Sequence, residues 1–159
     1  FGGGVDTSND ASNTTITNSQ IMGNSAIGGA GASGSVGSNG YGGGLGVGWG
    51  TLVGLTTDGS SLTVIDSRVT NNQAVGGAGS AGANGGNGEG GGLFVAPTAT
   101  ATLTDSNVMH NSAIGGPAGA GGSTGQGIGG GVYNAGTFNQ LLTAIDLNFA
   151  SFSNNNIFG

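Results

Sequence analysis

The sequence predicts an all-β fold, a parallel β-helix (solenoid) of about four coils that carries stacked Gly-rich polyproline-II-like arms. Three observations predict it. Two motifs alternate along the chain and recur four times, apolar and polar residues alternate within the second motif, and no segment shows the 3.6-residue period of a helix. Short strands that recur at intervals, with polar corners between them, are typical of solenoids.

The first motif is a glycine triplet followed by a branched apolar residue, at residues 2–5, 42–45, 90–93 and 129–132. A block that begins with Thr follows each triplet, at Thr15, Thr63, Thr102 and Thr143. We therefore interpret residues 1–159 as a single domain of four repeats, 1–40, 41–88, 89–127 and 128–159. Each repeat offers three candidate strands and so makes one coil, and four coils rise about 20 Å in all.

Each Thr block predicts a strand with one buried face, because apolar residues stand at every second position. The residue after the Thr forms one apolar or small column: Ile16, Val64, Leu103 and Ala144. Three residues after the Thr comes an Asx column: Asn18, Asp66, Asp105 and Asp146. We interpret the second column as a corner at which these side chains bond the backbone, because the Gly-x-Asp repeats of calcium-binding solenoids are absent.

Each repeat also contains an apolar residue followed three positions later by Asn. The pairs are Ile21 with Asn24, Val69 with Asn72, Val108 with Asn111, and Phe152 with Asn155. One interpretation is a structural ladder in which the side-chain amides of the four Asn residues bond along the stack. The alternative is that these residues form ordinary Asx turns at a corner.

Together, the two motifs resemble the repeats of polymorphic outer-membrane proteins and related autotransporter passengers of bacteria, in which GG with two apolar residues is paired with Phe-x-x-Asn. The first stands here at residues 3–5, 43–45, 91–94 and 130–133, and the second at 21–24, 69–72, 108–111 and 152–155. The resemblance covers all four repeats, although only the last has a true Phe. It implies a right-handed β-helix at a bacterial surface, in agreement with the crossover rule for parallel strands. It transfers no catalytic residue.

Three Gly-rich arms of 17 residues each connect the repeats, at 28–44, 76–92 and 115–131. Glycine recurs at every third position, except that the third arm has Ala118 and Thr124 in this pattern. A glycine at every third place suits polyproline II helices whose backbones touch, so we expect the arms to stack through backbone hydrogen bonds and to run out and back or to cover a flank. The alternative is three surface loops of low complexity.

The composition excludes several classes of function. The 159 residues include 40 Gly, seven Asp or Glu, a single cation at Arg68 and no Cys. One cation cannot neutralise nucleic-acid phosphates or an anionic membrane, and no apolar stretch is long enough to span a bilayer, so we expect no nucleic-acid partner and no membrane insertion. So few ionisable groups also predict that the protein is no enzyme and has no metal site and no cofactor.

These features lead us to expect a structural, extracellular protein, a subunit of a filament, sheath or stalk on a bacterial cell surface. A solenoid ends in unpaired strand edges, which natural proteins cap or charge. The chain begins at a glycine triplet, ends where an arm would start and carries almost no charge. Gly159 of one copy would then meet Phe1 of the next and continue the coil. The expected partner is the chain itself, in a head-to-tail homopolymer with Phe1 and Phe158 at the interface.

Two other functions fit parts of the sequence. An adhesin-like passenger module would bind glycans or a host surface through Tyr41, Tyr133 and Trp49, although Trp49, in an insertion of the second repeat, equally suits a contact to another chain or a cap on the core. Ice binding is suggested by Thr-x-Thr at 15–17 and 102–104. The Thr column is broken at Ile65 and Ile145, so we expect no regular Thr lattice.

Overall fold

The computed structural model describes residues 1–8, 11–48 and 59–159, and in these ranges the chain is all-β, with twenty strands in five sheets and no helix. Every strand pairing is parallel. The chain visits the sheets, named A to E here, in a fixed order and then returns to the first one. This stacking of parallel strands is consistent with a parallel β-helix.

The strands of each sheet, in their order across it, are as follows. Sheet A contains β1 (Val5–Thr7), β6 (Leu45–Val47), β11 (Leu93–Val95), β16 (Val132–Asn134) and β20 (Ile157–Phe158). Sheet B contains β2 (Asn13–Thr17), β7 (Ser61–Ile65), β12 (Thr100–Thr104) and β17 (Thr137–Leu141). Sheet C contains β3 (Gln20–Met22), β8 (Arg68–Thr70), β13 (Asn107–Met109) and β18 (Ala144–Asp146). Sheet D contains β4 (Ser25–Ile27), β9 (Gln73–Val75), β14 (Ser112–Ile114) and β19 (Phe149–Ala150), and sheet E contains β5 (Gly40–Tyr41), β10 (Gly88–Glu89) and β15 (Gly127–Ile128).

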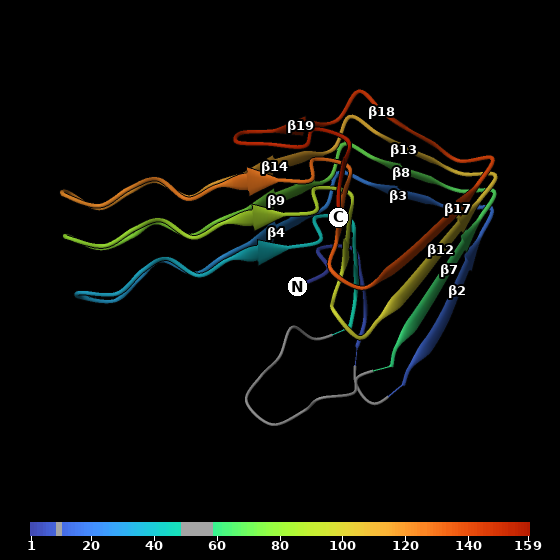
Figure 1. Cartoon of the computed structure of the whole chain (residues 1–159), viewed down its shortest axis with the longest axis horizontal. Helices are drawn as coiled ribbons and strands as arrows, with labels where there is room; N and C mark the ends of the chain where they lie inside the picture. Colours follow the sequence, from blue (N-terminus) through green and yellow to red (C-terminus); the bar gives the residue numbers. More distant parts are fainter. Residues whose placement is uncertain (9–10, 49–58) are drawn as a thin grey trace.

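Sheets A, B and C enclose a three-sided core, and sheets D and E lead from it to the arms (Figure 1). The inward-facing residues are apolar and fully buried: Leu62 and Val64 on β7, Ala101 and Leu103 on β12, Leu93 on β11, and Val108 on β13 are at most 1% exposed. Burying a Leu or Val side chain contributes about 1.5–3 kcal/mol, so each coil stabilises its neighbours chiefly through these columns. The expected strand with one buried face is therefore present on β7 and β12.

Two corners in each coil carry residues with positive φ. The corner between sheets B and C holds Asn18, Asp66 and Asp105 at φ of 47–49°. The corner between sheets C and D holds Gly23, Asn71 and His110, at φ of 55–71°. Asn, Asp and Gly adopt this left-handed conformation more readily than other residues. The second corner divides the expected apolar-x-x-Asn strand in two, which explains why a coil has more strands than the three that the sequence analysis expects.

The fourth repeat has a different register from the one that the sequence analysis assigns. Strand β17 pairs with β12 so that Gln140 lies beside Leu103, where Ala144 was expected. Asp146 lies on β18 and not at the corner, which is occupied by Leu142 at φ 50°. Thr143 matches the earlier Thr residues in sequence but does not occupy their place in the sheet. Strand pairing with β12 begins at Thr137, and the next residue, Phe138, continues the apolar column beside Ala101.

The three arms run out and back side by side, away from the three-sided core (Figure 1). At each tip a hydrogen bond closes a four-residue turn, as from Ser35 N–H to the Ala32 carbonyl at 2.8 Å. The third residue of that turn, Gly34, has φ 77°, which a type II turn requires and which glycine adopts without strain.

Backbone hydrogen bonds join neighbouring arms at every third residue. In the first arm, Gly28, Gly31, Gly37 and Gly40 donate to carbonyls of the second arm and its root at 2.8–3.0 Å. In the second arm, Gly76, Gly79, Gly82, Gly85 and Gly88 donate to the third in the same way, at 2.8–3.0 Å. A spacing of three residues is the period of polyproline II. The arms are thus hydrogen-bonded to one another, and their backbone groups have partners other than water.

Candidate functional site

The Asn ladder connects the coils at the corner between sheets C and D. The Oδ1 atom of Asn72 accepts two hydrogen bonds from Asn24, one from the backbone N–H and one from Nδ2, both at 3.0 Å. Asn72 donates to Asn111 in the same way at 3.0 Å, and its Nδ2 also donates to the Ile21 carbonyl at 2.9 Å. Asn72 and Asn111 are only 1% exposed, so a missing partner here would leave a buried polar group.

The fourth member of this ladder is Asn148 and not Asn155. Asn148 Oδ1 accepts from the Asn111 backbone N–H at 2.9 Å and from Asn111 Nδ2 at 3.0 Å. Asn155 instead accepts a hydrogen bond from the Ala150 backbone N–H at 2.9 Å. The ladder ends at Asn156, whose Oδ1 accepts from Asn148 at 3.3 Å and whose Nδ2 donates to Asp146 at 3.2 Å. The pair Ile145 and Asn148 has the apolar-x-x-Asn spacing, so the sequence did contain the correct match.

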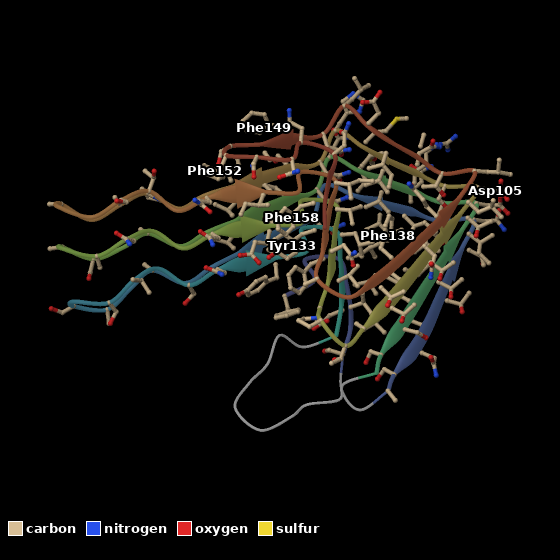
Figure 2. The ribbon with its side chains drawn as sticks, in the orientation of Figure 1. Asp105, Tyr133, Phe138, Phe149, Phe152 and Phe158 are labelled. Carbon is tan, nitrogen blue, oxygen red and sulfur yellow. The ribbon has the colours of Figure 1, made fainter. Side chains whose placement is uncertain are left out.

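Four of the five residues named as interface candidates lie in one column of aromatic rings. The ring centroids are 5.0 Å apart for Phe1 and Tyr41, 4.8 Å for Tyr41 and Phe94, 5.4 Å for Phe94 and Tyr133, and 4.7 Å for Tyr133 and Phe158. Figure 2 shows Tyr133 and Phe158 on the side of sheet A from which the arms extend, whereas Phe138 points into the core. The fifth candidate, Trp49, lies outside the described residues.

Phe94, which was not among the predicted interface residues, is at the centre of this column and 4% exposed. Phe1 and Tyr41 precede their glycine triplets, whereas Phe94, Tyr133 and Phe158 lie on the strands of sheet A, so no single sequence column unites them. The ring of Phe1 lies over Gly46, the residue that pairs with Phe94 on the neighbouring strand. The rings of Phe94 and Phe158 stack on the ring of Tyr133. Tyr41 instead meets Phe1 and Phe94 at tilted angles of 34° and 55°, so both tyrosines contribute to one aromatic column.

Among the described residues, one carboxyl group is buried, and it lies beside this column. Glu89 is 8% exposed, and its Oε1 accepts hydrogen bonds from Asn39 Nδ2 and Asn87 Nδ2, both at 3.3 Å. Asn39 Nδ2 also donates to the Tyr41 hydroxyl at 2.9 Å. Burial raises the pKa of Glu89 above its ordinary value, and the hydrogen bond from Asn87 opposes that change. Burial raises the pKa of Tyr41 and of Tyr133 as well.

The outer face of sheet B carries a regular array of hydroxyl groups. Thr15, Thr63 and Thr102 lie side by side in its central column, and Asn139 completes that column on β17. Ile145 lies on β18 in sheet C, and Leu141 takes the place beside Thr104 that the alignment gave to Ile145. Ile65 does belong to the face, in the column that begins at Thr17. That column is therefore still broken at two positions, Ile65 and Leu141, and the central column has Asn139 where the alignment placed Thr143.

The last layer of strands exposes large apolar side chains. Leu141, Leu142, Leu147, Phe149 and Phe152 are 54–77% exposed, and all five lie within residues 141–152. Two of them, Leu142 and Leu147, occupy the corner positions with positive φ, where earlier coils have Asn, Asp, Gly or His. In the first layer, Met22 and Ile27 are 58% and 72% exposed. Large contiguous apolar patches are typical of surfaces that meet another protein, whereas single exposed apolar residues are common on any surface.

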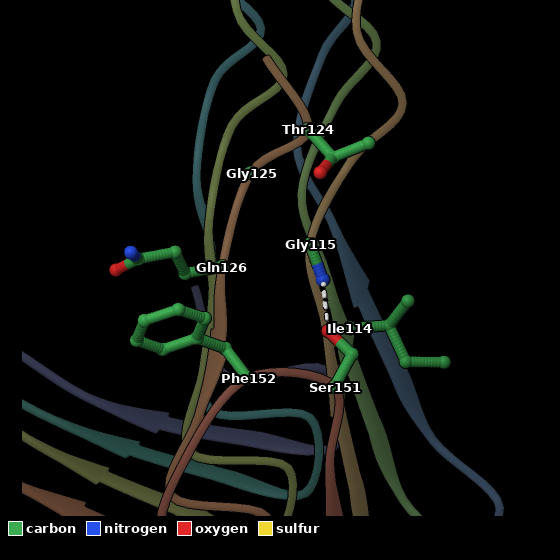
Figure 3. A pocket seen from close by; sticks show the side chains of 7 residues that line it. All are labelled: Ile114, Gly115, Thr124, Gly125, Gln126, Ser151 and Phe152. Carbon is green, nitrogen blue, oxygen red and sulfur yellow. Dashed lines mark hydrogen bonds between the residues drawn. The ribbon is translucent and has the colours of Figure 1, made fainter.

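A pocket of about 360 Å³ lies between the third arm and the last layer (Figure 3). It is lined by Ile114, Gly115, Thr124, Gly125, Gln126, Ser151 and Phe152. At its base, the Gly115 N–H donates to Ser151 Oγ at 3.1 Å. The equivalent N–H groups of Gly28 and Gly76 donate instead to backbone carbonyls at the root of the next arm. The pocket therefore marks the place where the last repeat lacks an arm.

Within the described ranges, no cluster of three or more His, Cys, Asp or Glu side chains could hold a metal ion. The same part of the chain contains no helix with the length and apolar character that a membrane span needs. Comparisons of the chain with protein-family models, with curated proteins and with solved structures find no match.

Proposed function

We propose that the chain is a right-handed parallel β-helix of four coils with polyglycine-II-like arms, and that it is an extracellular structural subunit of a head-to-tail bacterial filament, sheath or stalk. The observation that carries the proposal is the stacking. Sheets A to D add a parallel strand with every repeat, and the core columns, the Asn ladder and the aromatic column all run along the same axis. A second copy would extend these columns once β20 has left its place on β16.

The two end layers support assembly by their exposed side chains and their lack of charge. The last layer exposes Leu142, Leu147 and Phe149, and the first exposes Met22 and Ile27. The strands at both ends have a neighbour on one side only among the described residues. Edge strands with so little charge are templates for pairing with another chain. A heterologous contact of this kind generates an open filament when the rotation does not close a ring.

The position of β20 constrains the joint between copies. Ile157 pairs with Val132, and Val5 occupies the same column four strands away. In an uninterrupted coil, β1 of the next copy would take the place that β20 holds on β16. The simple joint of Gly159 against Phe1 is thus blocked in sheet A, and assembly requires β20 to yield its place to β1.

Electron microscopy of the purified chain at high concentration tests the proposal. We expect unbranched fibres whose diffraction shows a spacing of about 4.8 Å along the fibre axis, the distance between paired strands. A monodisperse monomer with no fibres at any concentration up to the solubility limit would overturn the proposal.

A further inference from the structure

The outer face of sheet B is a two-dimensional array of small uncharged side chains. Strand register places the outward residues in three columns: Asn13, Ser61, Thr100 and Thr137; Thr15, Thr63, Thr102 and Asn139; and Thr17, Ile65, Thr104 and Leu141. Seven of these twelve residues are Thr, three are Ser or Asn, and none is charged.

The Thr content of this face exceeds what strand propensity alone explains. Thr is favoured in all strands, because its branched side chain fits the pleated surface. Sheet C follows sheet B along the chain and also consists of parallel strands. Yet it has a single Thr among its eight outward positions, which include Arg68, Met109 and Asp146. The outward positions of sheet D include Ile27, Val75 and Ile114. A face of uncharged hydroxyl-bearing residues is thus specific to sheet B.

The array is held rigidly from beneath. Leu62, Val64, Ala101 and Leu103 alternate with the outward residues and are 0–1% exposed, so the strands cannot twist or slide without disturbing the core. Neighbouring strands are about 4.8 Å apart, and alternate residues on one strand are about 6.7 Å apart. The Thr side chains therefore repeat on a fixed grid of about 4.8 by 6.7 Å.

The hydroxyl groups of this grid are available to water. Within the described part of the chain, the array has one internal hydrogen bond, from Ser61 Oγ to Asn13 Oδ1. The Thr hydroxyls form no hydrogen bond with other protein groups in that part, so each can bind a water molecule, while the adjacent methyl groups leave hydrophobic gaps between those waters. No charged side chain on this face orients water by ionic hydration, so the positions of such waters follow the spacing of the grid.

We propose that the outer face of sheet B binds ice, with the hydroxyls of Thr15, Thr63 and Thr102 as its central anchors. The grid of hydroxyl and methyl groups orders water at repeats close to those of the ice lattice, and the ordered layer then joins the crystal. Thr17, Thr100, Thr104 and Thr137 extend the array on either side. Ile65 and Leu141 supply only apolar contact, so the hydroxyl array is most complete on β12. This activity is independent of filament formation, because the face is lateral to the coil axis.

Thermal hysteresis and retention in slowly growing ice test the proposal on the intact chain. We expect the wild type to depress the freezing point below the melting point and to enter the ice. Thr102→Tyr, at the centre of the array, should reduce both effects several-fold, since the ring prevents the face from meeting a flat crystal. Thr70→Tyr changes an outward Thr on sheet C and should leave both unchanged.

Thr102→Val guards against a folding defect, because it keeps the branched shape and strand propensity and removes the hydroxyl alone. It should keep the unfolding midpoint and lower the hysteresis. The proposal is overturned if the wild type shows no hysteresis, or if the Thr70 and Thr102 variants lose it equally. Fibres without ice affinity would overturn the ice-binding proposal and support the proposed filament. Ice affinity without fibres would support the ice-binding proposal and overturn the proposed filament.

Discussion

Asn111 accepts two hydrogen bonds from Asn72 on a single oxygen atom, from the backbone N–H and from Nδ2, both at 3.0 Å. Asn111 Nδ2 in turn donates to the Val69 carbonyl at 2.9 Å. The side chain thus satisfies backbone groups of the coil beside it as well as the neighbouring amide. Because both Asn residues are 1% exposed, the ladder is the main polar connection inside the corner.

Asn111→Ala should therefore destabilise the fold by about 2–4 kcal/mol, because it leaves buried donors of Asn72 and the Val69 carbonyl without a partner at about 1–3 kcal/mol each. Urea unfolding followed by circular dichroism measures the loss. Asn155→Ala is the matched control and should cost at most about 1 kcal/mol, since Asn155 is exposed and accepts one hydrogen bond. Equal effects of the two substitutions would contradict the ladder as described.

Much of the fold could be predicted from the repeats, because a parallel stack forces equivalent residues into columns. The pairing of Ile21 with Val69 and Val108 follows directly from the apolar-x-x-Asn spacing. The fourth repeat failed because two segments share that spacing, Ile145 with Asn148 and Phe152 with Asn155. Only backbone pairing of β18 with β13 decides between them.

Other features depend on three-dimensional proximity that no single repeat encodes. The aromatic column combines Phe1 and Tyr41, which precede their glycine triplets, with Phe94, which follows one. The burial of Glu89 arises where the root of an arm meets sheet A, a contact between parts of the coil that are separate in every repeat. In contrast, the exposed Thr124 is explained once the arms are seen to stack. It stands at the position of Gly37 and Gly85, whose added Cβ atoms would lie 2.0 Å from carbonyl oxygens of the next arm, and the third arm has no further arm beyond it.

Gly77→Ala should destabilise the arm bundle, because an added Cβ would lie 2.0 Å from the Gly29 carbonyl oxygen of the neighbouring arm. Overpacking of this kind costs about 1–3 kcal/mol. Gly29 is the equivalent residue of the first arm, and its added Cβ would come no closer than 3.9 Å to any atom, at Ser38 Oγ. Gly29→Ala should therefore change stability by at most about 0.5 kcal/mol. Urea unfolding of both variants, together with amide exchange in the arms, provides the comparison, and equal tolerance of alanine at both sites would argue against close stacking.

Glu89 should make the protein less stable as the pH rises. Its pKa is raised in the folded chain above the value of 4.5, so the folded state retains the proton that the unfolded state releases. The stabilisation is complete below about pH 4.5 and is lost as the pH passes the raised pKa. The urea midpoint of the wild type should fall over this range, and Glu89→Gln should flatten the dependence and raise the midpoint at neutral pH. Asp105→Asn removes the same charge from an exposed corner and controls for the change in net charge; a slope that persists in Glu89→Gln would show that another group is responsible.

Removal of β20 should promote assembly, because β20 occupies the edge of β16 that β1 of a second copy would need. A chain that ends at residue 156 exposes Val132 and leaves this edge open. We expect its fibres to grow several-fold faster than those of the wild type in light-scattering and electron-microscopy time courses. Ile157→Asn weakens β20 without shortening the chain and should have a smaller effect in the same direction. Val5→Asp places a charge in the apolar column on β1 and should stop fibre growth in both backgrounds. If truncation slows growth or leaves it unchanged, the joint between copies does not use the edge of β16.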